Sequence, residues 1–418
     1  MKILHINASD IGSTGKIVQD ISRLAVTDGW DAVSLFPKRN RTPDPCIREY
    51  MTSLPLEQGI YRRICRVFGH QYGLAPISTV RIRRILHKEK PDVVHLHSIN
   101  GHCVNIYQLL AYLKKNRIPT VVTNHAEFFY TGNCSHAFFC EEWKNGCHRC
   151  KKRQQATGCR FFGKPHTAWK KMKHAFAGHS NVHIVSVSPW SYNRSSSAPI
   201  LEGLPQSTIL NGVNCKVFFY RDQRNAREAL GLSSEERIVL HVTSNFTDYL
   251  QDNKGGRYLI ELAERFRNKK VRFLVAGRHS ISEPLPENIT LLGRISDQDL
   301  LATYYAAADL TVLVSQRETF GMAVAESLCC GTPVVGFESG GSESVALQSC
   351  SEFVPFGDVQ ALERIMDSCW LKYKTTEAAE QLSRIAVETY RSERMARQYI
   401  DLYHAMVEMD KVRNGWKR

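Results

Sequence analysis

The stretch Leu310–Gly336 reads LTVLVSQRETFGMAVAESLCCGTPVVG, and its pattern decides the fold that we expect. The apolar run Leu310–Val314 predicts a buried strand, and Gly321 allows the tight turn that follows it. Residues 322–329 continue as a helix, and the apolar run Pro333–Phe337 predicts the next strand. A strand, a glycine turn, a helix and another strand form the repeating unit of a parallel α/β sheet.

The turn in this stretch predicts a site for a polar ligand. The backbone amides of Phe320, Gly321 and Met322 stand at the start of the predicted helix, where unpaired donors can bind an anion. Glu318 in the loop and Glu326 on the helix are eight residues apart, and carboxylates can hold sugar hydroxyls by charge-assisted hydrogen bonds. The plainer alternative is a helix-dipole partner at the first position and a solvated glutamate at the second.

The same alternation of strands and helices runs along the whole chain. Apolar runs predict further strands at 2–7, 31–36, 91–97, 120–124, 182–188, 237–243, 271–276 and 289–292. This pattern indicates an α/β protein with two doubly wound, Rossmann-like domains, in which ligands bind in the crevice at the carboxyl ends of the strands. We expect an N-terminal domain at 1–212 with a Cys-rich insertion at about 127–176, and a C-terminal domain at 213–392. The chain is helical from residue 359, and the last helix, 393–418, is expected to cross back to the N-terminal domain.

Several segments together resemble the retaining glycosyltransferases of family 4, which have the GT-B architecture. Those that match the family as a whole are Glu318-x7-Glu326 followed by Gly331–Val335, the linker Ile209–Asn214, Lys254-Gly255 and Gly340–Ser344. Those that resemble the subgroup for bacterial surface polysaccharides (O-antigen, capsule or colanic-acid type) are Gly12–Lys16, His95–His102 and Asn124-His125. The resemblance covers nearly the whole chain and implies the GT-B fold, in which the two Rossmann-like domains face a central cleft.

For the C-terminal domain, the resemblance implies a site for a nucleotide-sugar donor. Glu326 would hold the ribose, Glu318 the transferred sugar, and Lys254 the diphosphate as it leaves. The complete expected donor site is Gly15, Ser244, Lys254, Arg294, Glu318, Phe320, Gly321, Met322 and Glu326. An arginine that the family usually has before the lysine is absent from Ser244–Asn253, and Arg278 is the candidate replacement by proximity in sequence.

For the N-terminal domain, the resemblance implies an acceptor side formed by Thr14, His97 and Asn100. It also places His125 among the catalytic residues, together with Glu318 and Lys254, and it implies no catalytic metal. Taken alone, the glycine loop is as well explained as a plain turn, the histidines as core or capping residues, and Lys254 as a surface lysine.

Charge is divided unevenly along the 418 residues, whose net charge is +14. Residues 1–215 hold 29 Lys and Arg against 13 Asp and Glu, so the whole excess lies in the first half. Arg62, Arg63 and Arg66 interleave with apolar residues at helical spacing, which suits an anionic membrane and a polyprenyl-pyrophosphate-linked oligosaccharide acceptor. A solvated basic surface is the alternative.

The first residues, Met1–Asn7, are typical of a strand that runs into a polar loop, so we expect no signal peptide. No apolar stretch approaches the roughly 20 residues needed to span a bilayer. We therefore expect a cytoplasmic protein, peripheral on the inner face of the cytoplasmic membrane. Thirteen cysteines in such a protein indicate reduced thiols.

Four cysteines are closely spaced, in the pattern Cys134-x5-Cys140-x6-Cys147-x2-Cys150. One Cys-x2-Cys pair and two further thiols can supply the four ligands of a tetrahedral structural zinc. Unligated thiols, an iron–sulfur cluster or disulfides are the alternatives.

The function that we expect is retaining transfer of a hexosyl or N-acetylhexosaminyl group from a nucleotide-sugar to a lipid-linked oligosaccharide during synthesis of a bacterial surface polysaccharide. One alternative is a GT-B nucleotide-sugar epimerase, which would act without an acceptor. The other is a non-enzymatic basic protein that binds membrane or nucleic acid. We expect no nucleic-acid partner, because such a binder gives no reason for Glu318, Glu326 and Lys254 to occur together.

Overall fold

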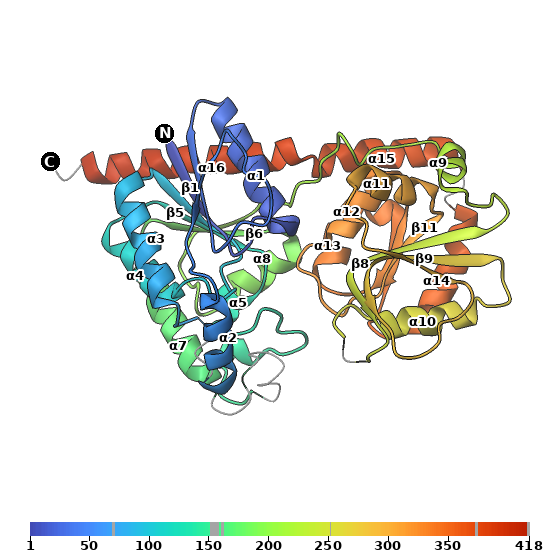
Figure 1. Ribbon diagram of the computed structural model, residues 1–418, viewed down its shortest axis with the longest axis horizontal. Helices are drawn as coiled ribbons and strands as arrows, with labels where there is room; N and C mark the ends of the chain where they lie inside the picture. The colour runs from blue at the N-terminus through green and yellow to red at the C-terminus, as the bar shows by residue number, and fades with distance from the viewer. Residues whose placement is uncertain (69–71, 151–158, 160–162, 251, 373–374, 416–418) are drawn as a thin grey trace. The chain divides into compact units, whose positions relative to one another are not determined.

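The computed structural model describes residues 1–68, 72–150, 159, 163–250, 252–372 and 375–415. The chain divides into two compact units (Figure 1). Unit 1 contains Met1–Leu210 and Glu393–Arg418, and unit 2 contains Asn211–Ser392. Each unit is a parallel sheet with helices on its faces, and each is described here by itself.

Unit 1 has a seven-stranded parallel sheet in the order β3-β2-β1-β4-β5-β6-β7. Its strands are β1 (Lys2–Ile6), β2 (Asp31–Phe36), β3 (Arg48–Met51), β4 (Val93–Leu96), β5 (Thr120–Asn124), β6 (Val182–Ser186) and β7 (Gln206–Thr208). Its helices are α1 (Gly12–Thr27), α2 (Glu57–Phe68), α3 (Pro76–Glu89), α4 (Ile106–Lys115), α5 (Phe128–Thr131), the 3-10 helix η1 (Glu142–Asn145), α7 (Pro165–Phe176) and α8 (Pro189–Ser196).

Both faces of this sheet are buried, as is usual for parallel sheets with helical crossovers. Alternate residues of β1 illustrate this, because Ile3 packs on one face and Leu4 on the other. The face that carries Ile3 is covered by α1 and by α16 (Ser392–Gly415), the helix that begins where unit 2 ends (Figure 1). Tyr399 and Tyr403 of α16 are fully buried there.

Unit 2 has a six-stranded parallel sheet in the order β10-β9-β8-β11-β12-β13. Its strands are β8 (Arg237–Thr247), β9 (Val271–Ser280), β10 (Ile289–Gly293), β11 (Leu310–Leu313), β12 (Val334–Phe337) and β13 (Ser351–Val354). Its helices are α9 (Gln223–Leu230), α10 (Gly256–Arg265), α11 (Gln298–Ala307), α12 (Met322–Cys329), α13 (Gly341–Val345), the 3-10 helix η2 (Gln348–Cys350), α14 (Val359–Lys372) and α15 (Thr376–Tyr390).

The expected α/β architecture of two doubly wound sheets is confirmed. The short strands β3, β7 and β13 were not predicted, because each has only three or four residues and no sustained apolar run. Residues 165–176 of the expected insertion form α7, whose Met172 and Phe176 belong to the core of unit 1. Within the described residues, no helix is both long and apolar enough to cross a membrane.

Candidate active site

The carboxyl ends of β8 and β11 form the switch point of the sheet in unit 2. The strands β9 and β10 extend the sheet on one side of β8, and β11, β12 and β13 extend it on the other. Ligands of doubly wound sheets bind in the crevice between the loops that diverge at this point. Lys254 lies on the loop after β8 and Glu318 on the loop after β11, so the fold brings together two residues that are 64 positions apart.

Close backbone packing fixes these loops. Gly255 has a φ of 72°, and a Cβ there would lie 1.9 Å from the carbonyl oxygen of Val314. A Cβ on Gly341 would lie 2.2 Å from the carbonyl carbon of Thr319. The backbone N–H and C=O of Glu318 both bond to the loop after β12, at 3.1 and 2.8 Å. Glycine is therefore required where the three loops meet, and Glu318 is held on both sides.

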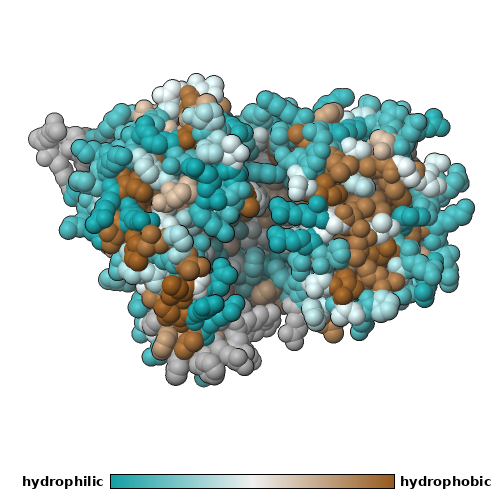
Figure 2. Space-filling view, viewed as in Figure 1, coloured by the Kyte–Doolittle hydropathy of each residue, from teal (hydrophilic) through white to brown (hydrophobic). Residues whose placement is uncertain are grey.

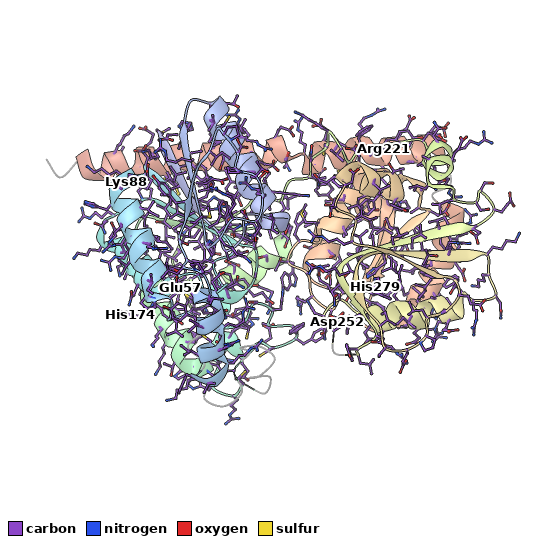
Figure 3. The ribbon with its side chains drawn as sticks, in the orientation of Figure 1. Glu57, Lys88, His174, Arg221, Asp252 and His279 are labelled. Carbon is purple, nitrogen blue, oxygen red and sulfur yellow. The ribbon has the colours of Figure 1, made fainter. Side chains whose placement is uncertain are left out.

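Lys254 and Glu318 form an ion pair at the switch point. The Nζ and Oε1 atoms are 2.7 Å apart, and the side chains are 28% and 22% exposed. The Glu318 carboxylate raises the pKa of Lys254, although burial opposes this. Asp252, labelled in Figure 3, accepts a hydrogen bond from the Lys254 backbone N–H at 3.2 Å. A charged ammonium is thereby fixed beside a carboxylate, an arrangement that can bind a diphosphate and a hydroxyl-rich group together.

The N-terminus of α12 lies beside this pair in the chain. Gly321 stands at the N-cap position with a φ of 84°, and no side chain there caps the first amides of the helix. Phe320 is buried, and Met322 is partly buried. Further along α12, the Oε2 of Glu326 accepts a hydrogen bond of 3.1 Å from the hydroxyl of Tyr305, a fully buried residue of α11. Tyr305 was not predicted as a site residue, because it is an aromatic in a helical apolar pattern.

The other expected donor residues lie further along the same edge. Ser244 is exposed near the end of β8, and Arg294 is exposed directly after β10. Arg278 pairs in register with Asn245 across β8 and β9. A pocket at this edge is lined by Asn245, Thr247, Tyr249, Leu250, Asp252 and Ser280. Figure 3 labels Asp252, which lines this pocket, and His279 near the end of β9.

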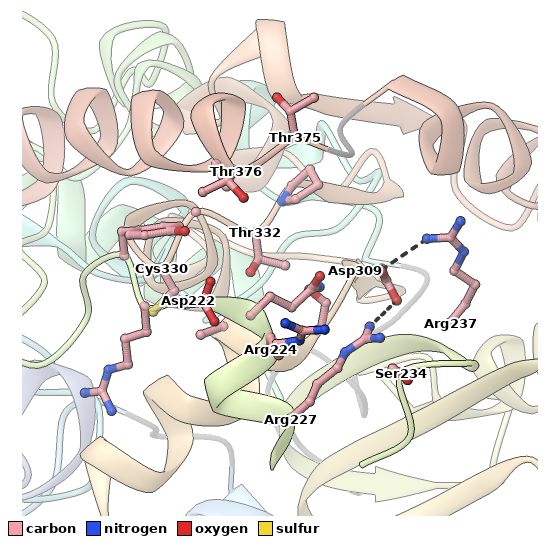
Figure 4. A pocket seen from close by; sticks show the side chains of 18 of the residues that line it. Asp222, Arg224, Arg227, Ser234, Arg237, Asp309, Cys330, Thr332, Thr375 and Thr376 are labelled. Atoms are coloured by element: carbon pink, nitrogen blue, oxygen red, sulfur yellow. Dashed lines mark hydrogen bonds and ion pairs between the residues drawn. The ribbon is translucent and has the colours of Figure 1, made fainter. Parts of the chain in front are cut away.

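The amino ends of the same strands carry a different pocket (Figure 4). Arg227 and Arg237 both pair there with Asp309, at 2.7 and 3.4 Å. Arg237 begins β8 and Asp309 immediately precedes β11, so this pocket is on the edge opposite to Lys254. Because ligands of doubly wound sheets bind at the carboxyl ends of the strands, we do not assign the donor to this pocket.

The switch point of the sheet in unit 1 lies between β1 and β4. Thr14 lies in the first turn of α1, and its Oγ1 accepts a hydrogen bond of 3.1 Å from the Nδ2 of Asn7. A Cβ on Gly15 would lie 2.6 Å from the carbonyl carbon of Asp10, so glycine is required where α1 packs against the loop that precedes it. His97 and Asn100 follow β4, and the Asn100 Nδ2 donates to the Ser135 Oγ at 2.9 Å.

A chain of buried histidines runs through this switch point. The Nδ1 of His5 lies 3.0 Å from the Nε2 of His97, and the Nδ1 of His97 lies 3.1 Å from the Nε2 of His125. His95 stacks on His97 with ring centroids 3.7 Å apart. Its own nitrogens contact the hydroxyl of Tyr403 at 2.6 Å and the Oγ1 of Thr123 at 2.7 Å. The C-terminal helix α16 therefore supports the strand ends that carry the expected acceptor residues.

Burial keeps these rings neutral. It lowers the pKa of His5 and of His125 to about 3, and it lowers those of His95 and His97 well below the usual value. The Nε2 of His5 is buried without a hydrogen-bond partner among the described residues. A buried N–H without an acceptor is rarer than an unused lone pair, so we infer that His5 carries its proton on Nδ1. The chain then donates from His5 through His97 to the Nε2 of His125.

His5 was missed from the sequence, where it lies within an apolar strand. Its contact with His97 arises only because β1 and β4 are neighbours, with His5 in register with His95. Tyr403 was also missed, because its position opposite β4 depends on α16 returning to unit 1. The four clustered cysteines lie on the segment between α5 and α7.

Two family profiles match the chain. Residues 238–370 match the profile of "Glycosyl transferases group 1", and residues 15–216 match that of "Glycosyltransferase Family 4". The chain is 25% identical over 213 residues to N-acetyl-alpha-D-glucosaminyl L-malate synthase of Bacillus anthracis, covering 49% of this chain and 55% of that protein. It is 35% identical over 144 residues to D-inositol 3-phosphate glycosyltransferase of Mycobacterium tuberculosis, covering 31% of this chain and 28% of that one. These matches therefore span about half or less of each curated relative.

Solved structures share the fold over nearly the full length. Sucrose-phosphate synthase from Thermosynechococcus elongatus is 17% identical, with a TM-score of 0.69 over 98% of this chain and 100% of that one. The Anabaena protein Alr3699/HepE, solved in complex with UDP, is 16% identical, with a TM-score of 0.64 over 97% and 100%. At these identities the likeness establishes the GT-B fold.

Proposed function

Because this chain belongs to the family-4 glycosyltransferases, we propose that it transfers a sugar from a nucleotide-sugar donor to a hydroxyl acceptor with retention of configuration. The observation that carries the proposal is the ion pair of Lys254 and Glu318 at the switch point of unit 2, beside the start of α12. A basic binder has no use for a lysine that is already neutralised by a carboxylate. A diphosphate-linked sugar can use both members of the pair, because its phosphates contact the lysine and its hydroxyls contact the carboxylate.

We assign the donor to the carboxyl edge of the sheet in unit 2. Lys254 and the amides of residues 320–322 bind the diphosphate, where charge develops as the bond breaks. Glu318 accepts hydrogen bonds from the transferred sugar, and Glu326 from the ribose. The Anabaena structure contains UDP, so UDP-sugars are the first donors to test.

The proposed step breaks the bond between the anomeric carbon and the diphosphate oxygen and forms a bond to the acceptor oxygen on the same face. The acceptor proton passes to the departing phosphate oxygen, and the nucleoside diphosphate leaves. The residues of this chain bind, orient and neutralise charge during the step, and none forms a covalent bond. His125, with a neutral ring, can hold a hydroxyl of the sugar or the acceptor without carrying charge into the site.

We assign a lipid-linked acceptor to unit 1 because of the surface of α2. This helix buries Glu57 and Cys65 and exposes Arg62, Arg63 and Arg66 beside an apolar row. Figure 2 shows brown, hydrophobic surface on the part of unit 1 that contains α2. The exposed apolar residues on and before α2 are Leu54, Leu56, Ile60, Ile64, Val67 and Phe68. A basic helix with an exposed apolar row suits an anionic leaflet and a pyrophosphate-linked acceptor.

The donor assignment is tested by thermal unfolding with UDP-, GDP-, ADP- and TDP-sugars. We expect one nucleotide to stabilise the chain, and Glu326→Gln to weaken its binding by about 10- to 100-fold, as for the loss of one hydrogen bond to a charged group. Glu264→Gln, at an exposed position of α10, is the control and should bind as the unaltered chain does. Equal binding by both variants would show that Glu326 does not contact the donor.

The membrane assignment is tested by sedimentation with vesicles. We expect binding to vesicles that contain phosphatidylglycerol and little binding to pure phosphatidylcholine. The double variant Ile60→Ser, Ile64→Ser should lose most of this binding. Ile385→Ser, at a similarly exposed position of α15, is the matched control. Retention of binding by the double variant would exclude α2 as the contact.

A further inference from the structure

The segment between α5 and α7 holds four cysteines and has little regular structure. Its described residues form the 3-10 helix η1 and turns. Cys147 has a φ of 56°, in the left-handed region that residues other than glycine rarely adopt. Such a conformation costs about 1 kcal/mol or more and persists where the surroundings determine the position of the side chain.

Hydrogen bonds draw this segment together. The backbone N–H of Cys134 donates to the Oγ1 of Thr131 at 3.0 Å, and the Sγ of Cys147 lies 3.9 Å from the Thr131 carbonyl oxygen. The Nε1 of Trp143 donates to the Cys140 carbonyl at 2.9 Å, and the N–H of Cys147 closes η1 at 2.8 Å. Cys134 and Cys147 therefore share one neighbour, and η1 joins Cys140 to Cys147.

Two of the four cysteines are buried together, and the other two adjoin them. Cys134 and Cys147 both belong to the core of unit 1. Cys140 and Cys150 are partly buried, and Cys150 follows Cys147 by three residues. The four cysteines thus gather in one small segment, and four thiolates are a ligand set that zinc takes.

We propose that Cys134, Cys140, Cys147 and Cys150 bind one structural zinc ion as four thiolates. Zinc takes four sulfurs in tetrahedral geometry at about 2.3 Å, and Cys147-x2-Cys150 has the spacing of a zinc-binding pair. Binding releases four protons to solvent and changes no oxidation state. All thirteen cysteines lie in the described part of the chain, and none is joined in a disulfide. The two negative charges of the complex fall in the half of the chain that carries the basic excess.

The histidine triad is the alternative metal site, and we do not favour it. His5, His95 and His97 are the one group of three candidate ligands within 4.8 Å among the described residues. Their facing nitrogens already form the hydrogen bonds described above. No three of the four Sγ atoms lie within that distance of one another among the described residues, so zinc binding requires the thiols to move closer together.

The proposed zinc loop is tied to the acceptor side of unit 1. Ser135, next to Cys134, accepts the hydrogen bond from Asn100. Glu127 accepts a bond of 2.6 Å from the N–H of Ala137 and pairs with Arg194 at 2.9 Å. A zinc ion here would fix the loop that holds Asn100 and the residues that follow His125, as metals do in segments without a core of their own.

The test is the metal content of the purified full-length chain, measured by inductively coupled plasma mass spectrometry. We expect about one zinc per chain. The double variant Cys147→Ser, Cys150→Ser should lose it, and the control Cys46→Ser, at an exposed cysteine outside the cluster, should keep it. If the double variant does not fold, cobalt substitution of the unaltered chain replaces it as the test. Four thiolates on cobalt give an intense sulfur-to-metal charge-transfer absorption.

Three results would overturn the proposal. The first is a folded chain without zinc whose four cysteines all react with iodoacetamide. The second is iron with acid-labile sulfide in place of zinc. The third is a disulfide between any two of the four, detected by peptide mapping. The metal measurement does not depend on transferase activity, so it stands apart from the proposed function.

Discussion

The ion pair of Lys254 and Glu318 gives the sharpest quantitative prediction. Glu318→Gln keeps the shape of the side chain and removes its charge, and Lys254→Met does the same for the lysine. At the observed 2.7 Å, two unit charges attract by about 6 kcal/mol at an effective dielectric of about 20. Desolvation and the partial exposure of both groups offset most of this, so we expect a coupling of about 1–2 kcal/mol in the double-mutant cycle.

The coupling is best measured in the whole chain with a signal that comes from unit 2 only, because a chain with two units does not unfold in a single step. Trp370 is the one tryptophan within residues 211–392. In protein labelled with 5-fluorotryptophan, its fluorine resonance, assigned with Trp370→Phe, reports urea unfolding of that unit. The four members of the cycle give the coupling free energy directly.

The pH dependence supplies a second readout. Glu318 raises the pKa of Lys254 in the folded state above its ordinary 10.5. Stability from a raised lysine pKa is fully present below the unfolded value and is lost as the pH rises through the folded one. The coupling should therefore be constant from about pH 7 to pH 9 and fall above about pH 10.5. A coupling below about 0.3 kcal/mol at pH 7 would refute the pair as drawn.

Three further predictions concern stability and are each measured by urea unfolding. Burial raises the pKa of Asp20 to about 6 in the folded state. The stability of unit 1 is therefore fully present below the ordinary pKa of 3.8 and is lost as the pH rises through 6. Asp20→Asn should raise the free energy of unfolding of unit 1 by about 1–3 kcal/mol at pH 8 and change it little at pH 4. Gly255→Ala should lower the free energy of unfolding by about 3 kcal/mol or more and abolish donor binding. The control is Gly59→Ala, which should not lower it, because a Cβ there meets nothing within 4 Å. Tyr403→Phe removes the hydroxyl that contacts the buried Nδ1 of His95 and should lower the free energy of unfolding by about 1–3 kcal/mol. The control Tyr249→Phe, at an exposed position, should leave it unchanged. An unchanged Asp20→Asn profile, a tolerated Gly255→Ala or a silent Tyr403→Phe would each contradict the corresponding packing.

Local patterns predicted the sheets well, because each buried strand is an apolar run and each crossover helix has its own period. Leu310–Gly336 contains its strand, turn and helix within 27 residues, and all three occur as expected. The strands at the edges of the sheets were harder to predict, since β7 has only three residues and none of them is buried. Its place in the sheet comes from pairing with β6 and leaves no local signal.

The site residues, like the strands, were predicted where the signal is local and missed where it depends on the assembled sheet. The contact of Lys254 with Glu318 depends on the order of strands in the sheet and was not predicted. The family resemblance placed both residues in the donor site without pairing them. The sequence predicted His97 and His125 as separate site residues but gave no signal that the histidines form a chain, because His5 and His97 are 92 residues apart. Side-chain partners across strands are set by register, and register is a property of the assembled sheet.

The return of α16 to unit 1 has a consequence for synthesis. Residues 393–415 leave the ribosome after all of unit 2, yet Met395, Tyr399, Ile400 and Tyr403 complete one face of the first sheet. A nascent chain that has finished unit 2 therefore still exposes the apolar side of β1, β4 and β5. We expect chaperones to stay bound to nascent unit 1 until residues 393–415 emerge, and truncation within these residues to destabilise unit 1 while sparing unit 2.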